Sequence, residues 1–455
     1  MRKTLFTIST VLLLVGCAKQ PNLRYALRAA GENRSELQKV IDYYHDAEPE
    51  LKKAALYVIT NLPGHYSYRD DSIHEYYKYA YYILSDKTLP RERQRDMLRD
   101  VTDSLYSKLP SNVISDAEIV KADFLIHSID WAYRQWKNCP WALQATFSEF
   151  VDYMLPYKGV ELQELDYWRD TLYNRYSKDL EQPVINDVEY NTTMGIADYI
   201  RRSVQDRTGR YGLYSRSGLP LLSAELLPIQ TFGNIPDYAL LGCLAMRAGG
   251  IPVALDETPV GARFVAPSRW FTILGDNGQR LWSEWDLATT IGIGFFPDER
   301  GPKVFRNTLG INLKRFEYSN KAKYPISFDL CKADITDQYF CTNDIDITIT
   351  PSERRKIKDN YAYIAAAVRR NDPIADTIIA GSHEWQIVDF GEVYKDHIHF
   401  EKMGREVLYR LMSFDGKEFQ EVSLPFILHK SGNIEFIPAD SANSAKLDKW
   451  RNNPL

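Results

Sequence analysis

The spacing of apolar residues changes near Gly218, and this change constrains the fold more than any other feature. Before it, from about Leu23, apolar residues recur every three or four positions, which is typical of amphipathic helices. The predicted helical stretches cover residues 23–109, 114–155, 168–176 and 192–204. We therefore expect a helical N-terminal region.

Beyond Gly218 a single predicted helix is followed by short β-like runs at 253–255, 270–274 and 280–285. The turn sequence of residues 275–278 predicts a hairpin between the second and third runs. From about Ala333 the predicted strands follow one another at 345–349, 361–368, 385–390, 397–400, 407–412 and 425–429. That spacing indicates a C-terminal antiparallel β-sandwich, and the fold class is α+β.

The N-terminus is typical of an export signal. Arg2 and Lys3 are basic, residues 5–15 are mostly apolar, and the small residue Gly16 precedes Cys17. A transmembrane helix needs roughly 20 apolar residues, so this run is too short to span a bilayer.

The quartet of residues 14–17, ending in Cys17, resembles the lipobox of bacterial lipoproteins. The resemblance implies cleavage after Gly16 and a lipid anchor on Cys17. Residues 18–21 lack acidic residues, which favours the outer membrane facing the periplasm and leaves surface exposure open. The alternative is an ordinary signal peptide with an incidental cysteine.

Composition argues against nucleic acid as a partner. The net charge is -5 and the pI is near 6.0, whereas a nucleic-acid site needs a concentrated basic face. The chain has 30 tyrosines. Exposed tyrosine rings can stack on sugars, but core packing is the expected role of most.

The cysteines after Cys17 are Cys139, Cys243, Cys331 and Cys341. In an exported protein they can pair in several ways, and the short spacing of Cys331 and Cys341 allows a small disulfide loop. No CxxC pair or His/Cys cluster indicates zinc. We expect neither a metal nor a cofactor.

A segment that joins a predicted helix to a strand carries a specific pattern of residues. It contains Gly233, the Asp237-Tyr238-Ala239 triplet, Arg247 and the Gly-Ile-Pro triplet of residues 250–252. This pattern resembles the transglutaminase-like superfamily. Counting back from Arg247 and from Gly250 places the family's cysteine at position 235, and the family's His-x-Trp and following Asp fall on residues 268–270 and on Asp286.

The resemblance implies a papain-like site. There a thiolate at a helix N-terminus is stabilised by the helix dipole, a histidine shares its proton, and an aspartate orients the imidazole. Here Ile235 stands at the nucleophile position, Ser268 stands at the histidine position, and only Asp286 is kept. We therefore expect a pseudoenzyme without catalytic residues.

Replacement of the missing groups by neighbours is not expected. Cys243 lies about 12 Å further along the same predicted helix, where it faces the core. No histidine lies between residues 128 and 382. A relocated site would need a histidine from another region.

The resemblance completes the expected organisation. It is a signal peptide (1–16), a helical region (17–210), a transglutaminase-like core (211–325), a β-sandwich (333–440) and a polar tail (441–455).

The predicted function is binding of glycan or peptide by a lipid-anchored envelope lipoprotein. Aromatic edges with a carboxylate suit such ligands, and the candidates around the inherited cleft are Asp237, Trp270, Trp282, Trp285 and Asp286. One alternative is an active peptidase or amidase with a relocated site. Another is a glycan-binding protein that acts through the C-terminal sandwich alone.

Overall fold

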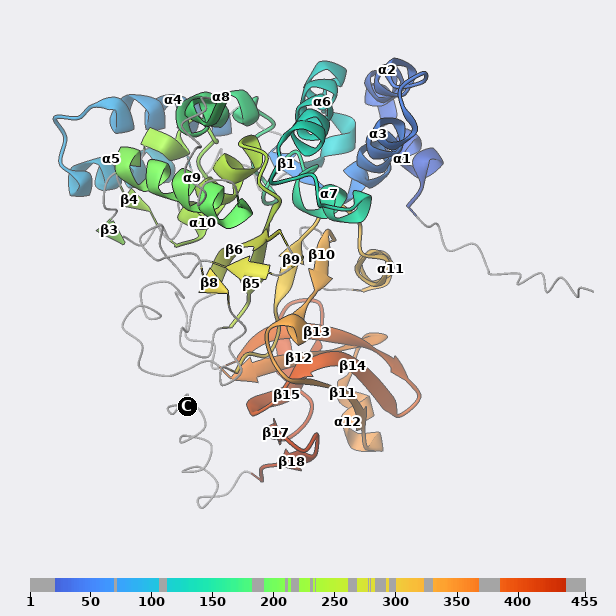
Figure 1. Ribbon diagram of the computed structural model, residues 1–455. Helices are drawn as coiled ribbons and strands as arrows, with labels where there is room; N and C mark the ends of the chain where they lie inside the picture. The colour runs from blue at the N-terminus through green and yellow to red at the C-terminus, as the bar shows by residue number, and fades with distance from the viewer. Residues whose placement is uncertain are drawn as a thin grey trace, which may run out of the picture.

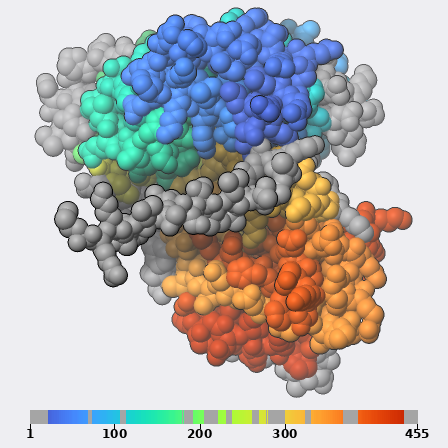
Figure 2. Space-filling model, turned by 90° about the vertical axis from the view of Figure 1, so that its right-hand side faces the viewer, coloured from blue at the N-terminus to red at the C-terminus, as the bar shows by residue number. Residues whose placement is uncertain are grey.

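The computed structural model describes residues 21–68, 72–105, 113–181, 192–208, 212–213, 221–229, 232–233, 235–260, 268–276, 278, 280–282, 292–293, 300–322, 330–367 and 385–438. A helical lobe and a β-rich lobe lie at opposite ends of the molecule, with strands of a smaller sheet between them (Figures 1 and 2). The predicted leader and Cys17 lie outside the described residues.

Most described helices belong to the helical lobe (Figure 1). They are α1 (Leu23–Ala29), α2 (Arg34–Tyr43), α3 (Pro49–Asn61), α4 (Ser72–Ser85), α5 (Arg91–Leu105), α6 (Ala122–Asn138), α7 (Phe147–Tyr153), α8 (Trp168–Tyr176), α9 (Thr193–Thr208) and α10 (Ile235–Ala248). Two more, α11 (Leu313–Lys321) and α12 (Pro351–Lys356), follow later in the chain. None of the helices described is long and apolar enough to cross a bilayer.

Short 3-10 turns connect several of these helices. They are η1 (Gly31–Asn33), η2 (Leu62–Gly64), η3 (Asp116–Glu118), η4 (Lys178–Glu181), η6 (Leu227–Ile229) and η8 (Thr336–Gln338).

The helical prediction differs from the structure in two ways. Beyond Gly218 a single helix was predicted, but α11 and α12 follow α10. Strands β1 (Tyr66–Tyr68) and β2 (Val113–Ser115) form a small antiparallel sheet that overlaps stretches predicted as helix. Runs of three residues carry no measurable period, so only the pairing between distant segments reveals them.

The middle sheet supports helix α10. Its strand order is β10-β9-β5-β6-β7-β8. The bounds are β5 (Val253–Thr258), β6 (Ser268–Leu274), β7 (Arg280–Trp282), β8 (Gly292–Ile293), β9 (Phe305–Asn307) and β10 (Lys332–Asp334), with a separate parallel pair of β3 (Gly212–Leu213) and β4 (Phe232–Gly233). The predicted hairpin is present as the antiparallel pair β6–β7.

One apolar core joins α10 to both the sheet and the helical lobe. Leu240 and Leu244 of α10 share it with Leu255 of β5, Phe271 of β6 and Leu172 of α8. The core therefore runs continuously across residue 210.

The C-terminal strands form one curled antiparallel sheet. Its path is β11-β14-β13-β12-β15-β17-β18, with β16 paired to β15. The bounds are β11 (Thr342–Thr348), β12 (Tyr361–Ala367), β13 (Trp385–Tyr394), β14 (His397–Gly404), β15 (Val407–Phe414), β16 (Phe419–Glu421), β17 (Phe426–Leu428) and β18 (Ile434–Phe436). Ile347, Ile364, Phe400 and Leu411 meet in one apolar core of this sheet. The predicted α+β class with a C-terminal antiparallel β domain is confirmed.

Candidate functional site

The predicted cleft is described in part. Helix α10 begins at Ile235, strand β6 begins at Ser268, and Trp282 ends β7. The side chains of these three residues, and Trp285 and Asp286 altogether, lie outside the described part of the chain. Their assignment as degenerate catalytic or ligand-binding positions stays a prediction.

The described residues of the α10 segment are buried. Asp237 is 4% exposed and Cys243 is fully covered, which agrees with the expectation that Cys243 faces the core. Arg247 is 2% exposed and donates to the backbone carbonyls of Tyr153, Val253 and Lys158. Its guanidinium therefore ties the end of α10 to neighbouring segments.

Trp270 belongs to an internal hydrogen-bond network. Its indole N–H donates to the Tyr339 hydroxyl over 3.0 Å, and that hydroxyl donates to Asp256 over 2.6 Å. Asp256 also accepts two 2.7 Å bonds from the guanidinium of Arg306 on β9. The polar edge of Trp270 is therefore used within the protein.

A histidine-containing cluster lies where β1, the loop after α7 and the start of β10 meet. The Nδ1 atom of His65 lies 2.7 Å from Glu161, and its Nε2 atom lies 3.0 Å from the carbonyl of Leu309. Cys331 lies beside this ring, and each of the two side chains shifts the pKa of the other. The fold thus brings together a cysteine, a histidine and a carboxylate that are far apart in the sequence.

The cluster includes a second ion pair. Lys158 lies 2.5 Å from Asp116, whose carboxylate also accepts from Ser67 and Tyr157. We call the set of His65, Ser67, Asp116, Tyr157, Lys158, Glu161 and Cys331 the buried cluster. The cations His65 and Lys158 balance the carboxylates Asp116 and Glu161. This balance matters because a buried charge is costly unless it is paired.

The backbone beside Glu161 is constrained. Leu162 has a φ of 63°, a region uncommon for residues other than glycine, and its N–H donates to the carbonyl of Tyr66. The N–H of Tyr66 in turn donates to Glu161 over 2.7 Å. This exchange fixes the carboxylate against His65.

The chemistry of the buried cluster follows from its hydrogen bonds. Both partners of the His65 ring are acceptors, so both ring nitrogens donate and the ring is an imidazolium. Burial alone would lower the pKa of His65, but Cys331 and Glu161 together raise it well above its ordinary value. Burial raises the pKa of the Cys331 thiol, an effect that His65 opposes.

These groups do not form a working nucleophilic site in this structure. Cys331 is 4% exposed and His65 is 3% exposed, so a substrate cannot reach them. An imidazolium has no lone pair with which to accept the thiol proton. The buried cluster joins four chain segments.

A partly exposed grouping of aromatic and polar side chains lies on α6 and at the start of α8. The Nε2 atom of His127 lies 2.7 Å from Asp170, and these side chains are 31% and 42% exposed. The ring of Tyr167, which is 50% exposed, stands edge-on to His127 at 5.0 Å. Trp131 lies 5.8 Å from His127 one helical turn further along α6.

This surface continues toward the end of α2. Tyr43 is 59% exposed, and its hydroxyl lies 3.4 Å from Asp130, which also accepts from Tyr44. We call the set of Tyr43, His127, Asp130, Trp131, Tyr167 and Asp170 the aromatic surface. Helices α2, α6 and α8 lie on the side of the helical lobe away from the C-terminal sheet (Figure 1).

The aromatic surface is held in place by its scaffold. The indole N–H of Trp131 donates to the carbonyl of Ala248 at the end of α10 over 3.2 Å, and Tyr173 of α8 packs edge-on against the indole. The guanidinium of Arg134 lies over the indole at 4.8 Å. Such pre-positioned rings bind with little loss of conformational entropy.

Sequence reasoning missed both groupings. The spacing of His127, Trp131 and Arg134 by one helical turn each was visible and places all three on one helix face. Their partners Tyr167 and Asp170 come from another helix and could not be assigned from one sequence.

The structure bears on the disulfide that the sequence allowed between Cys331 and Cys341. Cys139, Cys243, Cys331 and Cys341 are free thiols, so the Cys331–Cys341 loop considered from the sequence is not formed. Cys331 is enclosed beside His65, whereas Cys341 is exposed. Among the described residues, no group of three His, Cys, Asp or Glu side chains has the arrangement of a metal site.

Comparison of the chain with protein-family models, with curated proteins and with solved structures found no match.

Proposed function

We propose that this chain is a lipid-anchored envelope lipoprotein that binds glycan without chemical turnover. Its transglutaminase-like segment has isoleucine and serine at the positions of the catalytic cysteine and histidine. The observation that carries the binding proposal is the aromatic surface, where exposed rings adjoin an exposed histidine–carboxylate pair.

The chemistry of this surface favours a sugar. A sugar ring presents apolar C–H faces and a polar rim, which match an aromatic ring and adjacent hydrogen-bonding side chains. Tyr167 and Tyr43 supply rings, while His127, Asp170 and Asp130 supply donors and acceptors. Extended peptides often add to a strand edge, and this surface is built on helices.

A glycan array probed with the full chain, followed by calorimetry on the best ligand, tests the proposal. Tyr167→Ala should lower affinity at least tenfold while leaving the fold intact. Tyr394→Ala is the matched control, since Tyr394 is 71% exposed at the tip of the β13–β14 hairpin. Equal loss in both variants, or binding of peptides alone, would contradict the proposal.

The anchor is tested separately. Cys17→Ala should abolish incorporation of a labelled fatty acid and release the chain from the membrane fraction. Incorporation that survives this change would overturn the lipid assignment without affecting glycan binding. Placement in the outer membrane, facing the periplasm, is tested by protease access to intact cells.

A further inference from the structure

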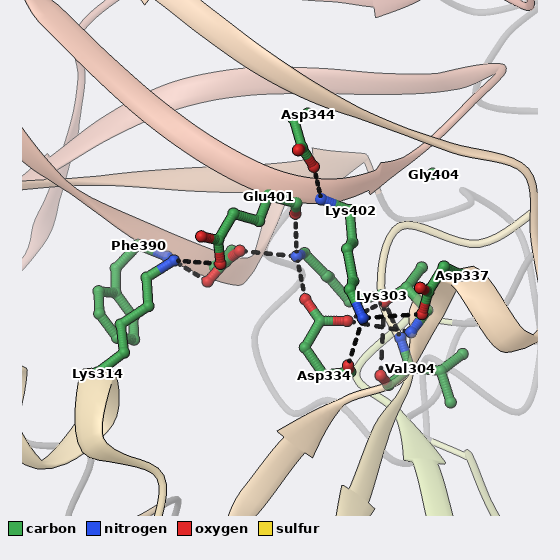
Figure 3. A network of polar contacts seen from close by, with 12 residues as sticks. Lys303, Val304, Lys314, Asp334, Asp337, Asp344, Phe390, Glu401, Lys402 and Gly404 are labelled. Carbon is green, nitrogen blue, oxygen red and sulfur yellow. Dashed lines mark hydrogen bonds and ion pairs between the residues drawn. The ribbon is translucent and has the colours of Figure 1, made fainter. Parts of the chain in front are cut away.

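A buried lysine lies between two carboxylates where the middle sheet meets the C-terminal sheet. Lys303 is fully covered, and its Nζ atom lies 2.5 Å from Asp334 of β10 and 2.8 Å from Asp389 of β13. The carbonyl of Glu401 on β14 accepts a third bond over 2.6 Å. Figure 3 shows the amine enclosed between Asp334 and the backbone of Glu401.

The two carboxylates are held differently. The Oδ1 atom of Asp334 accepts from the hydroxyl of Thr336 over 2.6 Å and from its N–H over 3.0 Å, so only Oδ2 faces the amine. The N–H of Val304 donates to the same hydroxyl, which orients the hydroxyl proton toward Asp334. Two donors on one carboxyl oxygen would stabilise negative charge developing there.

Asp389 is positioned to accept a proton from Lys303, because its Oδ2 atom lies 2.8 Å from the amine. Burial alone would raise its pKa, but Lys303 and the more distant Lys314 outweigh burial and lower it, so the carboxylate is ionised. A shift in register of the β12–β13 pairing beside Asp389 changes the direction of its side chain relative to a regular strand. The N–H of Phe390 fixes Oδ1, and Oδ2 faces Lys303.

We propose that Lys303 and Asp334 condense into an intramolecular amide bond, with Asp389 as the proton relay. Lys303 begins as an ammonium, which has no lone pair, so Asp389 first takes one of its three protons and leaves a neutral amine. The amine nitrogen then forms the Nζ–Cγ bond as the Cγ–Oδ2 bond breaks. The proton held by Asp389 and a second proton from the nitrogen leave with Oδ2 as one water molecule, and the third stays on the amide nitrogen. Asp389 ends ionised, as it began.

Proximity lowers the barrier to this reaction. Well-oriented intramolecular groups reach effective molarities of about 10⁵–10⁸ M, which speeds formation of the bond. The amine of Lys303 is fully covered, whereas the Asp334 side chain is 24% exposed, so the released water can leave on the Asp334 side. The product would fasten the segment before β9 to β10, beneath the C-terminal sheet.

Peptide mapping of the purified full chain by mass spectrometry tests this proposal. The bond should yield a tryptic branched peptide that joins residues 301–306 to residues 333–354 and lacks the mass of one water. Tryptic cleavage after Lys303 with an unmodified 333–354 peptide would overturn it. A branch to residues 371–395 would also overturn it, because Asp389 would then be the acylated residue.

Two variants and a control examine the roles. Lys303→Arg keeps a cation but should remove the branched peptide completely. Asp389→Asn should reduce its yield at least tenfold although Lys303 and Asp334 remain. Lys417→Arg should leave the yield unchanged, since Lys417 is exposed in the turn between β15 and β16. Full yield of the branched peptide in Asp389→Asn would contradict the role of Asp389 as proton relay. The peptide map of the wild-type chain shows whether the amide bond is present, even where a variant fails to fold.

Discussion

In the part of the chain that the structure describes, two of the histidine–carboxylate pairs share a 2.7 Å separation but have opposite surroundings. His65 and Glu161 are enclosed with a cysteine, whereas His127 and Asp170 lie at the surface among aromatic rings. The enclosed pair has the residue types of a cysteine enzyme without access. The exposed pair has access without a nucleophile.

This difference teaches that residue types alone do not define a site. In the buried cluster, low dielectric and saturated hydrogen bonds make the removal of one charged partner costly, because the other charge is left unpaired. On the aromatic surface, water screens the charges, which leaves the groups available to a ligand.

The largest effect is expected from Glu161→Ala. It leaves the imidazolium of His65 buried without its carboxylate, and loss of one partner of a buried pair typically costs about 3–5 kcal/mol. Urea unfolding followed by circular dichroism measures the change in free energy. If the free energy of unfolding falls by less than about 1 kcal/mol, the His65–Glu161 pair contributes no more than an exposed ion pair, which would contradict the prediction.

The second prediction concerns pH. The pKa of His65 in the folded chain lies above 6.5, its ordinary value. Its contribution to the free energy of unfolding is therefore complete below pH 6.5 and is lost as the pH rises through the pKa of the folded chain. The folded pKa of Glu161 lies below 4.5, so its contribution is full above 4.5 and is lost as pH falls. The pair therefore contributes most between 4.5 and 6.5.

Unfolding free energies of the wild type and of His65→Gln should differ most inside this window and converge at alkaline pH. The same comparison for His127→Gln is the control. A difference for His65→Gln that grows as pH rises would contradict the assignment of an imidazolium.

The third prediction concerns thiol access. In the folded chain, iodoacetamide should alkylate the exposed Cys341 at least tenfold faster than Cys331, and denaturant should remove the difference. Mass spectrometry of peptides measures both rates. If Cys331 is alkylated rapidly in the folded chain, and if this alkylation inhibits turnover of a peptide or amide substrate, the alternative of an active enzyme with a relocated site would be supported.

The sequence predicted the fold well where periodicity is long. The stretch 168–176 coincides with α8, and the alternating runs from Ile345 onward correspond to the strands of the C-terminal sheet. Strands β1 and β2 were missed because three residues carry no period and their pairing joins segments far apart in the sequence.

The sites were harder to predict for a related reason. His65, Glu161 and Cys331 are separated by long stretches of chain, so only the folded arrangement brings them together. Burial of Asp237 and the internal bond of Trp270 likewise depend on tertiary contacts. The sequence could mark chemical types, but it could not distinguish an enclosed group from an accessible one.

The smallest effect on stability is expected from Asp170→Asn. Both members of the His127–Asp170 pair are partly exposed, and exposed pairs contribute about 0–1 kcal/mol, so the free energy of unfolding should change by no more than that. Glycan affinity should nevertheless fall several-fold, because the amide changes the hydrogen-bonding pattern beside Tyr167. Urea unfolding and calorimetry on one preparation measure both quantities. A loss of stability comparable to that of Glu161→Ala, with affinity unchanged, would reverse the roles assigned to the two pairs.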